Sequence, residues 1–202
     1  MDRRHTAPST ARNREPILAV LQRVLPAEAR VLEVAAGAGE HAMFFARTMP
    51  GWNWAASDPD LDACASIAAW AEAERLPNVA PPRAIDVAEP VWGVEAEAPF
   101  DALVCINMIH IAPWEATLGL MAGAERILRS GGVLYTYGAY RRCGVQAAPS
   151  NETFDVWLKQ RDPRFGVRDL EAVDAAACSR GLTLEEIVDM PANNLSLVFR
   201  RN

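Results

Sequence analysis

Short apolar runs alternate with longer segments of helical periodicity along most of this 202-residue chain. The apolar runs predict strands, at about 30–35, 52–57, 83–87, 100–106, 133–137, 183–189 and 195–200. Apolar residues at helical spacing predict helices between them, at about 13–25, 41–49, 61–75, 113–129, 151–161 and 168–180. This alternation indicates an α/β protein in which helices cover both faces of a mostly parallel sheet.

The end of the chain departs from this alternation. The last two predicted strands are joined only by Met190–Asn194. A parallel pair needs a long crossover, so these two strands must be antiparallel. The expected fold is therefore a Rossmann-like, seven-stranded sheet that is mostly parallel and closes with a C-terminal antiparallel hairpin.

The chain fits a single domain. Residues 1–11 are polar and basic without periodicity, and we expect them to form a flexible arm. Residues 12–202 form the expected domain. A polar and aromatic segment near 138–169 follows the fifth predicted strand, and we expect it to be an insert that serves as a substrate lid.

The charge, the cysteines and the lengths of the apolar runs limit which partners and which cellular location we expect for this protein. The net charge of −6 and a pI near 5.1 argue against a nucleic-acid partner. The four cysteines are far apart, which predicts free thiols and no metal site. The first dozen residues lack the apolar core of a signal peptide, and no apolar run of about 18 residues occurs. We expect a cytoplasmic protein without membrane partners, and a homodimer stays open.

The stretch Val31–Gly39 is the most informative part of the chain. An apolar strand with an acidic Glu33 runs into a turn that contains Gly37 and Gly39. Gly-x-Gly at this point lets the backbone approach a nucleotide closely. The turn also fits the Gly-x-Gly-x-x-Ala pattern of dinucleotide sites. Glu33 would face like charge beside a pyrophosphate but not beside a sulfonium, which favours S-adenosylmethionine over NAD.

Two more carboxylates follow strands at the same expected edge of the sheet. Asp58 lies 19 residues after Gly39, where a carboxylate can accept hydrogen bonds from ribose hydroxyls. The alternative is a turn-forming Asp before Pro59. Asp86 ends the third predicted strand and can accept a hydrogen bond from an adenine amino group, or it can cap a turn.

The segment after the fourth predicted strand offers candidates for the acceptor side. Asn107 can bind near the amino-acid end of a cofactor, and His110 can act as a base, orient an acceptor or make a structural hydrogen bond. The segment lacks the Asn/Asp-Pro-Pro-aromatic signature of amino-group methylation. Further substrate-binding candidates follow in sequence, at Trp114, Tyr140, Arg141 and Asn151.

With these residues the sequence resembles class I S-adenosylmethionine-dependent methyltransferases. It is more closely similar to the methyltransferase-like protein 26 family, catalogued as domain of unknown function 938. The stretches that match are Arg12–Ile17, Ser57–Asp60, Asn107–Ile111, Ala148–Asn151 and Met190–Leu195. They span nearly the whole chain, and the family has no established acceptor.

The resemblance implies S-adenosylmethionine as the cofactor and supplies no substrate; we expect the methyl acceptor to be a small polar molecule. The implied cofactor positions are Glu33, Gly37, Gly39, Asp58, Asp86 and Asn107. Asn13 would fold over the cofactor mouth, unless its stretch is only a helix start. Ala35 departs from a pattern in which many class I enzymes carry a third glycine. Two alternatives stay open: a non-catalytic cofactor-binding module that acts through a protein partner, and an NAD-dependent oxidoreductase.

Overall fold

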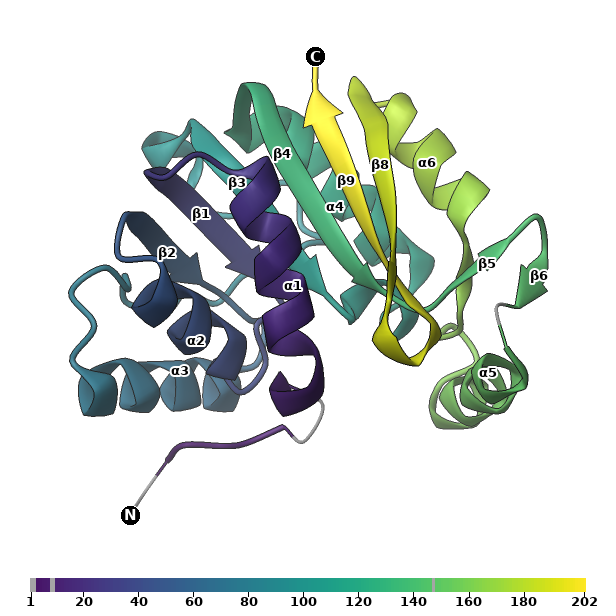
Figure 1. Cartoon of the computed structure of the whole chain (residues 1–202), viewed down its shortest axis with the longest axis horizontal. Helices are drawn as coiled ribbons and strands as arrows, with labels where there is room; N and C mark the ends of the chain where they lie inside the picture. Colours follow the sequence, from purple (N-terminus) through teal and green to yellow (C-terminus); the bar gives the residue numbers. More distant parts are fainter. Residues whose placement is uncertain (1–2, 8–9, 147) are drawn as a thin grey trace.

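A six-stranded sheet forms the centre of the molecule, which we describe from a computed structural model that covers residues 3–7, 10–146 and 148–202 (Figure 1). Its strand order is β2-β1-β3-β4-β9-β8. The strands are β1 Ala29–Val34, β2 Trp52–Ala56, β3 Phe100–Ile106, β4 Leu128–Gly138, β8 Leu182–Met190 and β9 Asn194–Arg201. The first four pair in parallel and β9 is antiparallel to both of its neighbours, as the short link between the last two strands predicted.

The expected strand near 83–87 does not form. The chain beside β2 makes only two isolated bridges, between Trp54 and Val79 and between Ser57 and Arg83. Three prolines, at 77, 81 and 82, interrupt this segment, and proline cannot donate to a strand ladder. The sheet therefore has six regular strands, and an irregular edge occupies the place of the seventh.

Helices cover both faces of the sheet. They are α1 Thr10–Val24, α2 Glu40–Thr48, α3 Leu61–Glu74, α4 Trp114–Ile127 and α6 Leu170–Cys178, while α5 Pro149–Arg161 lies apart from the sheet beside strand β6 Val145–Gln146 (Figure 1). Helices α1, α2 and α3 lie on one side of the sheet, and α4 and α6 on the other (Figure 1). Three short 3₁₀ helices occupy turns: η1 Glu95–Glu97, η2 Met108–His110 and η3 Pro191–Asn193.

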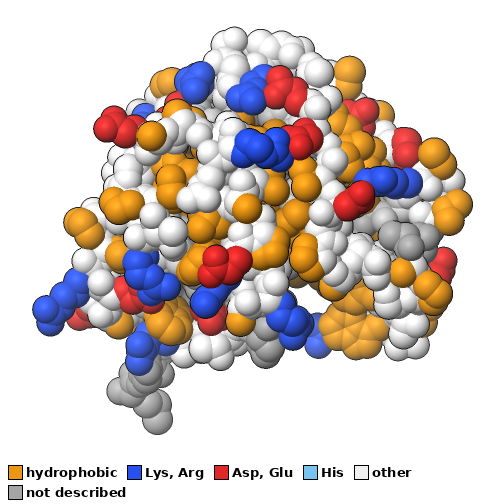
Figure 2. Space-filling view, viewed as in Figure 1, with side chains coloured by type: hydrophobic (Ala, Val, Ile, Leu, Met, Phe, Trp, Pro, Cys, Tyr) orange, Lys and Arg blue, Asp and Glu red, His pale blue; other side chains and the backbone are white. Residues whose placement is uncertain are grey.

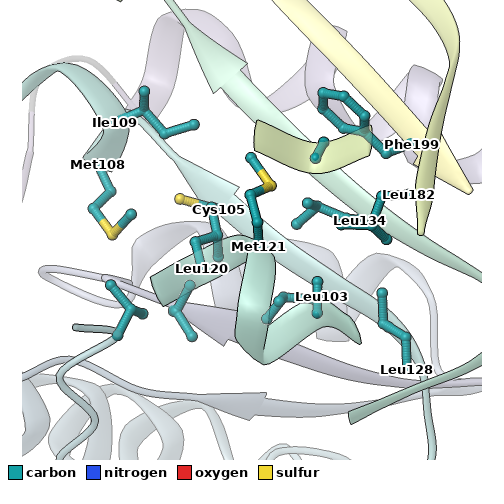
Figure 3. Packing of buried hydrophobic residues seen from close by; sticks show 14 of the residues in the cluster. Leu103, Cys105, Met108, Ile109, Leu120, Met121, Leu128, Leu134, Leu182 and Phe199 are labelled. Carbon is teal, nitrogen blue, oxygen red and sulfur yellow. The ribbon is translucent and has the colours of Figure 1, made fainter. Parts of the chain in front are cut away.

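Two hydrophobic cores lie on either side of the sheet, and strand β3 contributes to both. Leu103 and Cys105 point into the core beneath α4 and α6, where they pack with Leu120 and Met121 (Figure 3). The intervening residues of the strand face the core beneath α1 and α2. Because successive side chains of a strand point to opposite faces, a central strand covered on both sides must be apolar throughout.

A small second sheet belongs to the segment that we expected to be an insert. Strands β6 Val145–Gln146, β5 Tyr140–Arg142 and β7 Arg168–Asp169 lie side by side in that order, next to α5. Backbone hydrogen bonds attach this unit to the loop after β3, where the Gly166 N–H donates to the His110 carbonyl at 3.0 Å. Arg168 donates to the Ala112 carbonyl at 2.8 Å. The sequence pattern had shown no sign of this sheet.

Residues 3–7 lie against α3. The His5 N–H donates to Ser66 Oγ at 2.9 Å, and the Trp70 indole donates to the His5 carbonyl at 2.9 Å. Residues 1–2 and 8–9 of the expected arm are outside the described residues. Helix α1 already begins at Thr10.

The surface carries charges of both signs. On the face drawn in Figure 2, basic and acidic side chains are interspersed and gather into no large patch of one sign. Several are paired, such as Arg23 with Glu186 at 2.6 Å and Arg200 with Glu185 at 2.9 Å. Across the described ranges, no helix has both the length and the hydropathy that crossing a membrane would require.

Candidate functional site

Three neighbouring clefts open where the parallel strands end. The largest, about 560 Å³, we call the large cleft; it is lined by Ala35, Asp58, Pro59, Ile85, Asp86, Val87, Ala88, Met108, Ile111, Ala112, Pro113, Glu115, Ala116 and Arg164. The glycine-loop cleft, about 200 Å³, is lined by Ala7, Thr10, Glu33, residues 35–41, Ile106, Asn107 and Ile111. The hairpin cleft, about 190 Å³, is lined by Arg12, Asn13, Asn107, Tyr137, Pro191, Ala192 and Asn194. Ala35 and Ile111 line both of the first two clefts, and Asn107 lines both of the last two, so the three clefts adjoin one another, and we call them together the groove.

Gly37 leaves the floor of the groove open. Its φ of +55° favours glycine, and a Cβ atom at this position would meet nothing within 4 Å. Its N–H donates to Asp58 Oδ2 at 2.9 Å, which ties the loop after β1 to the end of β2. No atom of the described residues therefore fills the space beside Gly37, so a ligand could approach the backbone closely there.

Gly39 serves a different purpose from Gly37. Its φ is +89°, and a Cβ atom there would lie 2.8 Å from the Ile67 side chain. Ile67 is fully buried in the core. Gly39 therefore allows α2 to start close against α3. Of the two glycines of the motif, Gly37 leaves space for a ligand and Gly39 permits the helix packing.

Ala35 stands at the wall between the large cleft and the glycine-loop cleft. Its φ is +52°, which is a left-handed conformation that L-residues other than glycine rarely adopt. The position thus has the geometry of a glycine, consistent with the third glycine that many class I enzymes carry there. The strain costs on the order of 1 kcal/mol.

Glu33 is buried at the end of β1, with 1% of its surface exposed. The Trp54 indole N–H donates to Glu33 Oε2 at 2.8 Å. Burial raises the pKa of the Glu33 carboxyl to about 8, although the Trp54 hydrogen bond opposes this shift. The carboxyl group is therefore neutral at pH 7 and becomes an ion readily when a cation lies beside it.

Asp58 and Asp86 both line the large cleft, as predicted. Asp58 Oδ1 accepts a hydrogen bond from the Asp60 N–H at 3.0 Å, and Asp86 Oδ1 accepts one from the Ala88 N–H at 2.9 Å. Each carboxylate is thus oriented by its own turn. Between them lie apolar side chains, including Ile85 and Met108. Two carboxylates around an apolar slot suit a flat, hydroxylated ligand such as adenosine.

Asn107 and Asn13 lie on the hairpin side of the groove. Asn107 has a φ of +65°, and its N–H donates to the Tyr137 carbonyl at 2.8 Å. Asn13 Oδ1 is 2.9 Å from His41 Nε2. Because a carbonyl oxygen only accepts, Nε2 of His41 carries the proton. Burial lowers the His41 pKa to about 4, so this ring is neutral at pH 7.

His110 does not line any of the three clefts. It is 4% exposed, and its ring packs edge-on against Phe154 with 5.2 Å between ring centroids. Its other side covers Gly138, where a Cβ atom would lie 2.9 Å from the ring. Burial lowers the pKa of His110 to about 4. The expected base therefore lies behind the cleft wall, under the insert.

The remaining substrate-binding candidates hold the insert together and do not face the groove. Tyr140 is 1% exposed, and its hydroxyl lies 2.9 Å from Thr136 Oγ1. Arg141 pairs with Asp155 at 2.8 Å. Asn151 is buried and donates to the Asn193 carbonyl at 3.2 Å, and Trp114 lies beneath the Arg168 guanidinium at 5.9 Å. A buried Tyr140 has no surface at which to meet an acceptor, so that assignment is corrected.

Sequence reasoning missed two residues that line the groove, Arg164 and Tyr137, and a buried residue that supports it, Trp54. Trp54 orients Glu33, Arg164 brings the insert to the large cleft, and Tyr137 lines the hairpin cleft. Trp54 lies on the strand adjacent to β1 and pairs with Val31. Strand pairing alone would have pointed to it, whereas Arg164 reaches the cleft through an irregular loop.

Residues 4–201 match the model of a single protein family, described as "Protein of unknown function (DUF938)". The chain belongs to this family. The match covers nearly the whole chain, which agrees with the resemblance drawn from the five short stretches. The narrower assignment, to the methyltransferase-like protein 26 family, has no support from the match.

Several solved methyltransferase structures share this fold. An O-methyltransferase family protein from Burkholderia thailandensis superposes with a TM-score of 0.78 at 14% identity, over 93% of this chain and 56% of its own. CalO1, a methyltransferase in calicheamicin biosynthesis in an SAH-bound form, has a TM-score of 0.75 at 17% identity, over 96% and 54%. The S-adenosylmethionine-dependent methyltransferase SibL has a TM-score of 0.76 at 18% identity, over 95% and 55%.

These likenesses show the fold. The DUF938 chain has the Rossmann-like class I methyltransferase fold, with helices flanking a mostly parallel sheet that ends in antiparallel strands. It spans little more than half the length of the structures that it matches.

Proposed function

We propose that this protein is an S-adenosylmethionine-dependent methyltransferase that acts on a small polar molecule. The observation that carries the proposal is the groove at the carboxyl ends of the strands. It brings Glu33, Gly37, Asp58, Asp86 and Asn107 together. Ligands of open α/β sheets bind at this edge.

The residues of the groove fit the cofactor. The apolar slot between Asp58 and Asp86 would hold the adenosine, and the open backbone at Gly37 would hold the chain that follows. Glu33 would lie near the cationic end, where its high pKa lets it ionise in response to positive charge. When bound, S-adenosylmethionine supplies an electrophilic methyl group to an acceptor lone pair.

The chain's own contribution would be alignment and exclusion of water. Within the described residues, His41 is the only histidine that lines the groove, and its protonated nitrogen is bound to Asn13. This arrangement favours an acceptor that is already nucleophilic, such as a thiolate, since such an acceptor needs no protein base.

Calorimetry with S-adenosylhomocysteine tests the cofactor assignment. Asp58→Asn keeps an acceptor for the Gly37 N–H but removes one of two anionic oxygens, and we expect its affinity to fall about tenfold. Asp62→Asn, on the exposed side of α3, is the matched control and should bind like the parent. Equal affinity in the parent and in Asp58→Asn would remove the ribose assignment, and tighter binding of NAD would overturn the methyltransferase proposal.

A second candidate function follows from the place of His110. If no group in the groove promotes the reaction, the protein could bind S-adenosylmethionine and act through a protein partner without catalysis. Release of S-adenosylhomocysteine in the presence of small thiols and acids separates the two functions. A binding module would bind S-adenosylmethionine but would form no S-adenosylhomocysteine with any acceptor.

A further inference from the structure

The hairpin cleft differs from the rest of the groove in its charge. The glycine-loop cleft contains Glu33 and Glu40, and the large cleft contains Asp58, Asp86 and Glu115 beside Arg164, which is paired with Asp162 at 2.7 Å. Among the residues that the structure describes, those that line the hairpin cleft include no carboxylate. Its polar residues are an arginine, three asparagines and a tyrosine. The groove therefore changes from acidic to basic as it passes Asn107.

Arg12 is the charged residue of the hairpin cleft. It is exposed in the first turns of α1, and it takes part in none of the ion pairs that the described residues form. Most other guanidinium groups around the insert and the hairpin are paired, for example Arg141 with Asp155 and Arg142 with Asp189. Arg12 is thus a cation at the rim of a cavity, with its donors available to a ligand.

Polar groups behind Arg12 are fixed by hydrogen bonds. The side chains of Asn13, Asn194 and Arg12 oppose the rise that burial causes in the Tyr137 pKa, and Asn194 donates to the Pro191 carbonyl at 3.1 Å. Asn13 is in turn held by His41. Tyr137 is 4% exposed, and Asn13 is 6% exposed. The inner wall of the cleft is therefore a preorganised set of amide and hydroxyl groups, as a specific polar site requires.

The outer wall of the cleft is a strained turn. Ala192 and Asn193, in η3, have φ values of +58° each, which is unusual for two consecutive residues other than glycine. Side chains hold the turn in this form: Asn151 donates to the Asn193 carbonyl at 3.2 Å, and Asn194 donates to the Pro191 carbonyl at 3.1 Å. Strain that the surroundings maintain in this way is concentrated at ligand sites.

We propose that the hairpin cleft binds the methyl acceptor through a carboxylate group, with Arg12 as the counter-ion. This proposal rests on the proposed methyltransferase function and specifies the acceptor as a small organic acid. A planar guanidinium matches a carboxylate through two parallel hydrogen bonds, and amide groups can donate to the same oxygens. The volume of about 190 Å³ admits a small acid.

The position of the cleft suits an acceptor. Asn107 lines it together with the glycine-loop cleft, so an acid held by Arg12 has its other end directed toward Asn107 and the cofactor chain. The three carboxylates of the large cleft outnumber its one arginine and would repel the acid group, which favours one orientation of the acceptor. The segregated charges thus sort the two ligands: the cation beside Glu33 and the anion beside Arg12.

Nuclear magnetic resonance titration of the full chain tests this site. Propionate, inorganic phosphate and tetramethylammonium are the probes, and the side-chain amide signals of Asn13, Asn107 and Asn194 are followed with and without S-adenosylhomocysteine. We expect propionate to shift these signals and to bind at least tenfold more weakly to Arg12→Gln, because a charge-assisted hydrogen-bonded pair is lost. Arg23→Gln, an exposed arginine near the end of the same helix, is the matched control and should bind like the parent.

Each outcome decides a separate point. Equal propionate binding in Arg12→Gln and the parent, no shift of the asparagine signals, or tighter binding of phosphate or tetramethylammonium would overturn the carboxylate site. Tyr137→Phe provides a second variant, in which the ring stays and propionate binding should still weaken. If the parent binds S-adenosylhomocysteine but not propionate, only the acceptor site is overturned. If the parent does not bind S-adenosylhomocysteine, the proposed function is overturned as well.

Discussion

The Trp54 indole N–H donates a 2.8 Å hydrogen bond to the buried Glu33 carboxyl group, across the parallel pair of β2 and β1. One oxygen of Glu33 is thereby oriented from the core side, while the residue itself lines the glycine-loop cleft. Burial outweighs this hydrogen bond, and the pKa of Glu33 rises to about 8. The end of β1 therefore holds a carboxyl group whose charge depends on what occupies the cleft.

The raised pKa of Glu33 makes stability depend on pH. The unfolded carboxyl loses its proton near pH 4.5 and the folded one near pH 8, so the folded state holds the extra proton between these values. The free energy of unfolding should therefore fall as pH rises, by up to roughly 1 kcal/mol for each pH unit. We expect Glu33→Gln to remove this decline, as measured by urea unfolding.

Two histidines limit the useful pH range for that measurement. Burial lowers the pKa values of His41 and His110 from 6.5 to about 4, so stability also falls as pH drops below 6.5. The unfolded rings are still half protonated at pH 6.5 and become neutral about one pH unit higher, so they add a slope of opposite sign to that of Glu33. The difference in stability between the parent and Glu33→Gln cancels this contribution, because both proteins carry the two histidines. Equal pH dependence of the two proteins between pH 6.5 and 8 would contradict the raised pKa.

Cofactor binding should change the protonation of Glu33. S-adenosylhomocysteine carries an ammonium group, and a cation near a carboxyl group favours its ionised form. Binding at pH 7 should therefore release up to one proton from Glu33 to the buffer. Calorimetry in two buffers with different enthalpies of ionisation measures this release. We expect Glu33→Gln to bind without it, and a proton release that persists in this variant would place the titrating group elsewhere.

Substitution of the two motif glycines by alanine should affect different properties: ligand affinity for Gly37 and stability for Gly39. Gly37→Ala adds a methyl group into open space beside the groove, so its main effect should be at least tenfold weaker binding of S-adenosylhomocysteine. Gly39→Ala forces a Cβ atom to within 2.8 Å of Ile67, and we expect it to lower the free energy of unfolding by about 1–3 kcal/mol.

Urea unfolding and calorimetry on both variants, and on the parent, check this contrast. Both substitutions introduce backbone strain at a positive φ, so each variant controls for that shared effect in the other. If the stability loss were the same in both and the affinity loss also the same, the assignment of separate tasks to Gly37 and Gly39 would be wrong.

Much of the fold could be predicted from the pattern of apolar residues. The central strand at Phe100–Ile106 was placed residue for residue, because a strand buried on both faces is apolar throughout. The antiparallel pairing of β8 and β9 could be predicted because the segment that joins them is too short for a parallel crossover. The strand expected near 83–87 was wrong, since Ile85 and Val87 are apolar because they are buried in the core beneath α4, not because their segment pairs as a strand.

The site was predictable where it follows strand ends and not where it depends on irregular segments. Glu33, Gly37 and Asp58 lie in the groove because the ends of the parallel strands β1 and β2 share one edge, and Asp86 reaches it from the irregular segment beside β2. Tyr140 comes after β4 in the same way, yet it turns into the core. Local sequence does not show which way a side chain points after the ladder ends, and the contacts that decide it come from distant parts of the chain.

His110 should prove structural. Its ring fills the space between Phe154 and Gly138, so His110→Ala would leave a cavity and should lower the free energy of unfolding by about 2–4 kcal/mol. S-adenosylhomocysteine affinity should stay within about twofold of the parent, because His110 lines none of the clefts. His110→Gln preserves most of the volume and should recover part of the stability. Titration of the ring signals by nuclear magnetic resonance should show a neutral imidazole at pH 6, in keeping with its pKa of about 4. An imidazole that titrates near pH 6.5 and responds to S-adenosylhomocysteine would instead place His110 in the groove and restore it as a candidate base.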